Sequence, residues 1–235
     1  MTSKSSSSSR TRPATISEYV CSAIRDNILS GYYPLGSKLD QQSLATQHDV
    51  SVIPVREALR QLEAEGLVKI LPRRGAFVIE LSPPEIKELF HLRAVLEGYA
   101  TELAAPRLSS AQLQGLNHIL EQLEQATSHG DVPELLELNR AFHFYIYEAA
   151  ESPLLMSILS GLWDRATVYR RLYGQIPENH HRFLVEHMKI LRACESGDAM
   201  ASRQLMKDHI LRFGRDILSL LDAQEEQSTN GAGKP

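Results

Sequence analysis

The feature that most constrains this chain is a helix start at Ser51, which follows a shorter helical pattern after only a tight turn. Asp40 stands as the N-cap of a helix over Gln41–Gln47, because its carboxylate can accept hydrogen bonds from the first backbone N–H groups. Ser51 is expected to cap the next helix in the same way. Pro54 is tolerated there, since the first turn of a helix has backbone donors without intrahelical partners. Two helices joined this closely dominate the first third of the chain.

The residues on either side complete a small domain. Apolar residues recur close to helical spacing from Ile16 to Leu29, and the glycines and proline of "GYYPLGSKL" end that helix. Beyond Gly66, the segments "LVKIL", "PRRG" and "AFVIE" predict a strand, a turn and a strand, which form a hairpin from Leu67 to Glu80. Three helices followed by a hairpin indicate a winged helix-turn-helix domain over residues 14–80.

In a winged helix-turn-helix, the N-terminal residues of the third helix meet base edges in the major groove of DNA. Val55, Leu59 and Leu62 share the buried stripe of this helix, which turns Arg56 and Arg60 outward. Arg56 can then reach a guanine edge or a phosphate. An alternative stays open, in which this helix is an ordinary amphipathic helix with a charged face. The candidate DNA-contacting residues are Gln42, Ser51, Val52, Ile53, Arg56, Arg60, Arg73, Arg74 and Gly75.

Charge is divided unevenly along the chain. Residues 1–80 carry 10 Lys and Arg against 8 Asp and Glu, whereas residues 81–235 carry 15 against 21. A polyanion such as double-stranded DNA is therefore expected to bind the first third. No apolar run reaches the roughly 18 residues that span a bilayer, and no apolar core follows the basic residues at the N-terminus. We expect a cytoplasmic protein without a membrane partner.

Everything beyond "LSPPEIKE" has the pattern of helices. Six segments with short, turn-rich connections predict an antiparallel all-helical bundle over residues 85–223, and hence a mainly α protein. Residues 81–84, with Pro83 and Pro84, are expected to link the two domains. The Ser-rich residues 1–13 and the polar residues 224–235 are expected to form disordered tails.

Four polar residues on the predicted inward faces of the bundle suggest a metal site. Asn139 and His143 are four residues apart and share a helix face, and His187 and His209 lie on apolar stripes of the last two helices. Imidazole nitrogens converging from three helices can bind zinc, nickel or another divalent ion. The alternative is that each histidine is a hydrogen-bonded core residue, and the pattern alone does not decide between them.

The segment "PLGSKLDQQSLATQHDVSVIPVREALRQLEAEGLVKILPRRGAFV" resembles the N-terminal domain of GntR-family bacterial transcription regulators. The shared pattern includes L-A, V-S, P-V-R-E-A-L, L-x-x-E-G-L-V and R-G-x-x-V. The resemblance implies a DNA-contacting role for Arg56. Two departures are Leu35, which interrupts the usual Pro-Gly pair, and Val52, where many members carry a base-contacting arginine. Val52 and Ile53 could instead contact thymine methyl groups.

The segments "LFHLRAVLEGYATELAA", "LNRAFHFYIYEAAESPLL" and "EHMKILRACESGDAMASRQLMKDHI" resemble the FCD ligand-binding domain of the FadR subfamily, in its six-helix, VanR-like form. In metal-containing members an aspartate and three histidines bind the ion. The resemblance implies His143, His187 and His209 as ligands, with Asn139 at the aspartate position. An amide oxygen can coordinate a metal but brings no charge, so an effector carboxylate would have to supply the missing anion.

The same resemblance implies that Arg93 faces an effector cavity, where its guanidinium would bind a small carboxylate through paired hydrogen bonds. The alternative is a surface salt bridge between Arg93 and Glu97, one turn further on. Tyr145 and Arg170 are further candidates for the lining of the cavity, together with Trp163 and Tyr173.

Taken together, the sequence predicts a homodimeric transcription regulator that is not an enzyme, and more specifically a repressor. A small carboxylate effector and a divalent metal ion, with zinc expected first and nickel or manganese as alternatives, would control its binding to an operator. One rival interpretation is a sensor that answers to the metal ion alone. A second is a metal-dependent helical enzyme that activates water on the three histidines, although the sequence has no HExxH or GxSxG motif.

Overall fold

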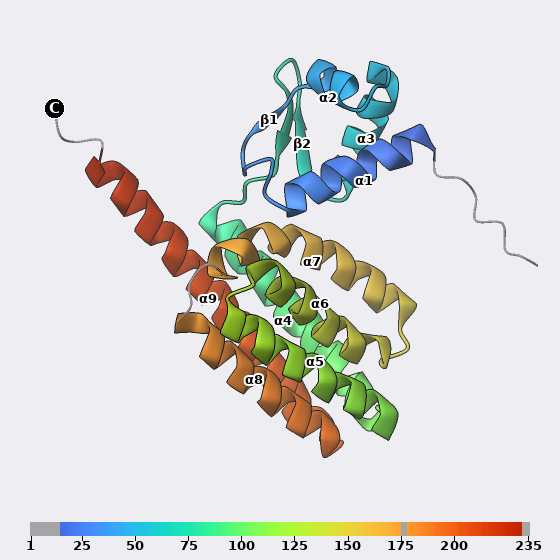
Figure 1. Ribbon diagram of the computed structural model, residues 1–235, viewed down its shortest axis with the longest axis vertical. Helices are drawn as coiled ribbons and strands as arrows, with labels where there is room; N and C mark the ends of the chain where they lie inside the picture. The colour runs from blue at the N-terminus through green and yellow to red at the C-terminus, as the bar shows by residue number, and fades with distance from the viewer. Residues whose placement is uncertain (1–14, 175–177, 232–235) are drawn as a thin grey trace, which may run out of the picture. The chain divides into compact units, whose positions relative to one another are not determined.

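The computed structural model describes residues 15–174 and 178–231 (Figure 1). Within these ranges, the side chains of residues 168, 170–174, 178–181 and 224–231 lie outside the description. The predicted tail at 1–13 and the end of the predicted tail at 224–235 also lie outside the described residues. The chain divides into two compact units between Ile79 and Glu80, and each unit is described by itself. No described helix is long and apolar enough to cross a membrane.

The N-terminal unit contains three helices, α1 (Ile16–Leu29), α2 (Gln41–Gln47) and α3 (Val52–Ala64). Helix α1 packs against α3, and α2 packs against α3 as well. The apolar stripes predicted from the sequence form this core, in which Val20 and Ile24 of α1 and Val55, Leu59 and Leu62 of α3 are fully buried. Because one face of α3 is held in this core, its opposite face is exposed.

A three-stranded antiparallel sheet completes the N-terminal unit, which confirms the winged helix-turn-helix fold. Strands β2 (Val68–Leu71) and β3 (Gly75–Val78) form the predicted hairpin, in which Ile70 pairs with Ala76. A third strand, β1 (Lys38–Leu39), pairs with the other edge of β3, so the order is β1-β3-β2. The sequence did not predict β1, because two residues are too few to display the alternation of a strand.

The two predicted N-caps differ in their chemistry. Asp40 caps α2 as expected, since its Oδ1 accepts hydrogen bonds from the Ser43 backbone N–H at 2.9 Å and the Ser43 hydroxyl at 2.8 Å. These bonds lower the pKa of the Asp40 carboxyl, because they favour its charged form. Ser51 occupies the N-cap position of α3, but its side chain makes no capping hydrogen bond. The expectation that the Ser51 side chain caps α3 is therefore wrong.

The C-terminal unit is the predicted helical bundle. Within the described residues it contains α4 (Pro83–Ala104), a short 3-10 helix η1 (Ala105–Arg107), α5 (Ser110–His129), α6 (Val132–Glu148), α7 (Pro153–Gly174), α8 (Glu178–Glu195) and α9 (Ala199–Gly231). Helix α4 packs against α6, α7 and α9, and its packing against α9 is the most extensive in the unit (Figure 1). The inner faces of α4, α6, α8 and α9 carry the buried polar residues that concern function.

Two helix boundaries differ from the sequence prediction. Pro83 and Pro84 form the first turn of α4 and do not lie in a linker, because a proline lacks only a donor that has no intrahelical partner at that position. Helix α9 continues to Gly231, beyond the expected end at Ala223. Glutamine and glutamate, which follow Ala223, are good helix formers, so their polarity does not end the helix.

Candidate metal centre and nucleic-acid interface

The four residues predicted as metal ligands lie together in the core of the bundle. Asn139 and His143 come from α6, His187 from α8 and His209 from α9, and none of them is more than 4% exposed. One ligand atom of each histidine lies within 4.8 Å of those of the other two. Side chains from three helices thus converge on one point, because α6 turns two polar residues, and α8 and α9 one each, into otherwise apolar stripes.

The orientation of His187 fixes where its proton lies. Its Nδ1 is 2.8 Å from the backbone carbonyl oxygen of Phe183, which can only accept a hydrogen bond. Nδ1 therefore carries the proton in the neutral ring, and Nε2 presents a lone pair. That Nε2 atom lies 3.0 Å from Oδ1 of Asn139 and 3.2 Å from Nε2 of His143.

His143 is oriented by a buried chain of hydrogen bonds. Its Nδ1 is 2.9 Å from the hydroxyl oxygen of Tyr147, one turn further along α6. The Tyr147 hydroxyl in turn donates a short hydrogen bond to the carboxylate of Glu97 on α4. Because the hydroxyl proton is given to Glu97, the Tyr147 oxygen accepts the Nδ1 proton of His143. The Nε2 lone pair of His143 then faces His187.

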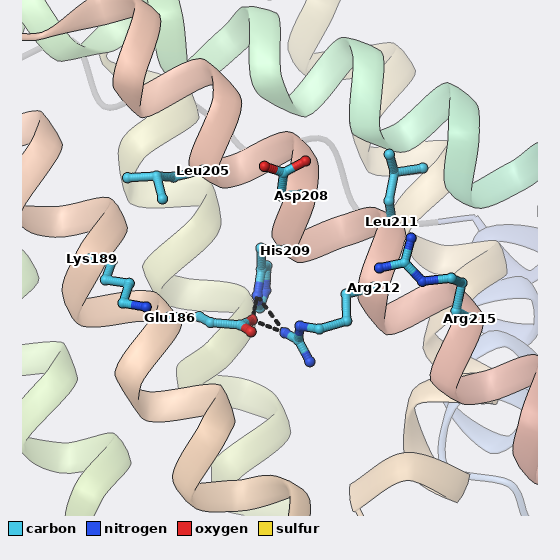
Figure 2. A pocket seen from close by; sticks show the side chains of 8 residues that line it. All are labelled: Glu186, Lys189, Leu205, Asp208, His209, Leu211, Arg212 and Arg215. Carbon is cyan, nitrogen blue, oxygen red and sulfur yellow. Dashed lines mark hydrogen bonds and ion pairs between the residues drawn. The ribbon is translucent and has the colours of Figure 1, made fainter.

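His209 is held by a carboxylate on the neighbouring helix. Its Nδ1 donates to Oε2 of Glu186 at 2.7 Å, and Arg212 forms an ion pair with the same carboxylate. Figure 2 shows these three side chains pointing toward one another between α8 and α9. As in His143 and His187, the proton sits on Nδ1, so Nε2 is the unprotonated ring nitrogen, the form that a metal ligand requires.

This donor set fits a divalent metal ion. Lone pairs of His143 and His187 and an amide oxygen face one another, an arrangement that is repulsive until a cation lies among them. Two nitrogens bound at about 2.0–2.1 Å to a tetrahedral zinc ion would lie roughly 3.3 Å apart, and the two Nε2 atoms are 3.2 Å apart. Metal-binding histidines ordinarily donate their second N–H to a carbonyl or carboxylate, as His187 and His209 do here.

Arg93 lies beside this cluster and is buried, with 1% of its surface exposed. Its Nε donates to Glu97 at 2.6 Å, so Glu97 is its partner as the alternative interpretation expected, but the pair is in the core and not on the surface. The guanidinium lies over the ring of Trp163, 4.6 Å from the centroid. Its Nη1 atom is buried and has no hydrogen-bond partner among the described residues.

The other two predicted effector contacts do not join the cluster in the described structure. Tyr145 faces α5, because a Cβ atom built on Gly115 would lie only 2.6 Å from the Tyr145 hydroxyl. The side chain of Arg170 lies outside the described residues, as does that of Tyr173. Trp163 does belong to the site, since its ring lies against His143, with centroids 5.0 Å apart.

Sequence reasoning missed the groups that orient the ligands. Tyr147 lies one helical turn after His143, and this spacing was the available signal. Glu186 directly precedes His187 in the sequence, whereas its carboxylate bonds to His209 on the neighbouring helix. A pocket of about 280 Å³ lies between α8 and α9, beside the bond between Glu186 and His209 (Figure 2). Its lining residues are Glu186, Lys189, Leu205, Asp208, His209, Leu211, Arg212 and Arg215.

The predicted DNA-contacting residues lie on α2, at the start and outer face of α3, and in and beside the hairpin turn. Arg56 and Arg60 are exposed on α3, and Ile53 at its start is 69% exposed although it is apolar. In the turn between β2 and β3, Arg73 has a left-handed φ of 61° and Gly75 one of 105°. Among the remaining candidates, Gln42, Ser51 and Arg74 are exposed and Val52 and Gly75 are half-buried.

Comparison with known proteins decides the family. Residues 16–78 match the family of bacterial regulatory proteins named for GntR, and residues 88–212 match the FCD domain. The chain belongs to the GntR family. The first match runs from α1 to β3 and includes the helix-turn-helix. The second begins within α4, ends within α9 and includes Asn139 and the three clustered histidines.

Relatives of this GntR-family chain are transcriptional regulators. The HTH-type regulator McbR of Escherichia coli K12 is 33% identical over 130 residues, which cover 55% of this chain and 59% of McbR. The HTH-type regulator YdhC of Bacillus subtilis 168 is 27% identical over 88% of this chain and 92% of its own. The repressor GlaR of Escherichia coli K12 is 27% identical over 80% of this chain and 89% of its own.

The fold is shared with solved structures of the same family. The structure of Escherichia coli McbR/YncC is 27% identical and superimposes with a TM-score of 0.75 over 88% of this chain and 98% of that one. A GntR regulator from Rhodococcus sp. RHA1, 23% identical, gives a TM-score of 0.74 over 86% and 97%. The family matches and the relatives together identify this chain as a DNA-binding transcriptional regulator of the GntR family.

Proposed function

We propose that this GntR-family protein is a homodimeric repressor whose operator binding is controlled by a small carboxylate bound beside a divalent metal in the C-terminal unit. The observation that carries the proposal is the convergence of Asn139, His143 and His187 on one point with their acceptor atoms facing inward. Arg93 lies nearby, because one oxygen of Glu97 accepts from Arg93 and the other accepts from Tyr147, the partner of His143. The Nη1 atom of Arg93 lacks a partner among the described residues.

His143, His187 and His209 would hold the metal through Nε2, with the Oδ1 atom of Asn139 as a fourth ligand. Zinc is the first expectation, because imidazole nitrogens suit it and a tetrahedral set needs four donors. Nickel and manganese are the alternatives. When bound, the ion supplies positive charge that attracts an anionic ligand. The ligands themselves are uncharged, so a carboxylate from the effector would complete the charge balance.

The effector's carboxylate would be fixed by Arg93. A guanidinium presents several N–H donors in one plane, and of the Arg93 donors Nε bonds to Glu97 in the described structure. The Nη1 donor therefore remains for an anion, and Trp163 beneath the guanidinium keeps it in place through its ring face. A carboxylate suits both partners, because it carries a negative charge and has two oxygens, one for this donor and one for the metal ion.

The proposed homodimer has support in an apolar surface of the C-terminal unit. Leu92, Val95 and Tyr99 lie exposed along one stripe of α4, and Leu154 and Ile158 lie exposed on α7. The two helices pack together, and a pocket lined by Leu92 of α4 and Leu162 of α7 shows that their outer faces adjoin. Apolar patches of this kind on a soluble protein commonly mark interaction sites.

Effector binding would favour a dimer geometry in which the two DNA-binding units no longer match the half-site spacing of the operator. A ligand shifts such an equilibrium only as far as its affinities for the two geometries differ. Release of the operator would then derepress the regulated genes. Within the DNA-binding unit, Arg56 at the start of α3 would read a base edge and Arg73 in the turn would contact phosphate.

The first experiment is to select operator DNA from a random duplex pool and to measure its affinity by fluorescence anisotropy. Arg56→Ala is expected to weaken binding by roughly tenfold or more, since a good bidentate base contact is worth about 1–3 kcal/mol. Arg203→Ala, which removes an arginine of the C-terminal unit, is the matched control and should bind as the wild type does. Equal affinities for the two variants would contradict the role of Arg56.

The second measurement adds a panel of small carboxylic acids to the zinc-loaded protein and to chelator-treated protein on the same operator. The proposal expects at least one acid to weaken operator binding, and only in the zinc-loaded protein. If no acid in the panel changes the affinity, the carboxylate mechanism is wrong.

A metal sensor without an organic effector is the second candidate. It is favoured by the pocket between α8 and α9 whose lining includes His209, since this side chain would be the nearest of the cluster to an ion that enters there (Figure 2). This function expects chelator alone to change operator affinity, and zinc alone to restore it. The same anisotropy assay therefore separates the two candidates.

A further inference from the structure

The inner donors of the proposed metal site carry no charge. Three neutral imidazoles and the amide of Asn139 would leave the two positive charges of the ion unbalanced by the protein. Two carboxylates, however, are connected by hydrogen bonds to the Nδ1 atoms of two of these imidazoles. Glu186 bonds directly to His209, and Glu97 is connected to His143 through the Tyr147 hydroxyl. Each carboxylate is also paired with an arginine, Arg212 or Arg93, so it acts on the imidazole mainly as a hydrogen-bond acceptor.

Glu186 is placed to act on one ligand. Its Oε2 accepts the Nδ1 proton of His209 at 2.7 Å, and the His209 side chain is only 3% exposed. Arg212 contacts the same carboxylate and continues to Asp216, whose Oδ2 also accepts from Arg182 at 2.6 Å. The carboxylate is therefore held between α8 and α9 and cannot easily turn away from the imidazole (Figure 2).

Glu97 is placed to act on the second ligand. Its Oε1 accepts from Arg93, and its Oε2 accepts from the Tyr147 hydroxyl, whose oxygen faces Nδ1 of His143. The Nδ1 atom is itself 3.8 Å from Oε2. All four side chains are fully buried, with exposures of at most 1%, so water does not compete with these hydrogen bonds.

We infer that Glu186 and the Glu97–Tyr147 pair are positioning groups that complete the metal site from its outer shell. They hold the Nε2 atoms of His209 and His143 inward, because they accept the Nδ1 proton directly or through the Tyr147 hydroxyl. A carboxylate that accepts the Nδ1 proton makes an imidazole a more basic ligand, and loss of such a partner typically weakens metal binding by about 10–100-fold. The inference rests on the metal site of the proposed function.

The test is a titration with zinc alone, in competition with a chromophoric chelator, on the full-length protein and two variants. Glu186→Gln keeps a hydrogen-bond acceptor but removes the charge, and Tyr147→Phe removes the hydroxyl link while it leaves the Arg93–Glu97 ion pair intact. Both variants are expected to bind zinc about tenfold or more weakly than the wild type. Cobalt(II) spectra should also shift in both, because the ligand field at His209 or His143 changes.

Glu102→Gln is the matched control. Glu102 forms an ion pair with Arg203 at 2.6 Å between α4 and α9, and its side chain is 26% exposed against 19% for Glu186. The control removes the same charge from the same kind of interhelical pair, but it does not touch a histidine of the cluster. Its zinc affinity should equal that of the wild type. Urea unfolding of each variant checks that the bundle is folded before the titration.

The outcomes separate the inference from the function on which it rests. If the wild type binds no zinc, the proposed metal site is wrong and the inference is wrong with it. If the wild type binds zinc and His209→Ala loses it, the metal site holds. In that case, wild-type affinity and an unchanged cobalt spectrum in Glu186→Gln and Tyr147→Phe would overturn the inference alone. An equal loss in Glu102→Gln would also overturn it, because the effect would then be one of general charge.

Discussion

His143 and His187 direct their Nε2 atoms at each other across 3.2 Å in the core of the C-terminal bundle. Each has its Nδ1 atom engaged by an oxygen, from Tyr147 in one case and from the Phe183 carbonyl in the other. Two lone pairs therefore face one another in a region of low dielectric, where repulsion is strong. A bound cation converts this unfavourable contact into two favourable bonds, which links metal binding to stability.

Zinc is accordingly expected to stabilise the C-terminal unit. A ligand that binds only the folded state adds about 2.7 kcal/mol at a free concentration one hundred times its dissociation constant. Thermal unfolding followed by circular dichroism should show a higher midpoint with zinc and a lower one after chelation. His187→Ala should abolish the difference. A similar increase in that variant would locate the zinc at another site.

Asn139→Asp should tighten zinc binding by on the order of tenfold or more, because it places a negative charge in direct contact with a dication. Asn139→Leu, of similar volume but without an oxygen donor, should weaken binding. Competition titration with a chromophoric chelator measures both. If the aspartate variant binds no more tightly than the wild type, Oδ1 of Asn139 is not a ligand.

The aspartate variant also bears on the effector. The carboxylate of Asn139→Asp would balance part of the metal's charge. The metal would then attract the carboxylate of an effector less strongly. Operator release by an acid that acts on the wild type should therefore require a higher concentration in Asn139→Asp.

The four residues of the cluster could be predicted from the sequence because helical periodicity reports which side chains share a face. Asn139 and His143 are one turn apart, and His187 and His209 interrupt apolar stripes. The same rule, applied further, would have favoured Tyr147 over Tyr145. Residue 147 is one turn beyond His143 and lies on its face, whereas residue 145 is about 200° around the helix and faces α5.

Other features could not be predicted because they depend on packing between helices. The spacing of Arg93 and Glu97 is the same in a surface salt bridge and in a buried one, and only the positions of α6, α7 and α9 around α4 decide the burial. The bond between Glu186 and His209 joins two helices, so no local pattern encodes it. Strand β1 forms only because β3 presents an edge to Lys38 and Leu39.

Removal of Arg93 should destabilise the bundle strongly, because Arg93→Ala leaves the Glu97 carboxylate buried without its ion-pair partner. Breaking a buried pair in this way costs about 3–5 kcal/mol. Urea denaturation should show this loss for Arg93→Ala. The double variant Arg93→Ala, Glu97→Ala should lose less than the sum of the two single variants, since no uncompensated charge remains. Strict additivity would mean that the pair contributes nothing through its mutual contact.

The close approach of α4 and α9 gives a last prediction, at Gly214. A Cβ atom added to Gly214 would lie 2.6 Å from the Cβ atom of Phe90, which cannot swing away because it is joined directly to the backbone of α4. Gly214→Ala should therefore force the two helices apart and cost about 1–3 kcal/mol of unfolding free energy.

Gly161 of α7 is the matched control, since nothing lies within 4 Å of an added Cβ there. Gly161→Ala should be neutral or stabilise by up to about 1 kcal/mol, because alanine loses less backbone entropy than glycine in a helix. Urea denaturation of the two variants measures both effects, and a stable Gly214→Ala would show that α4 and α9 are packed less closely than described.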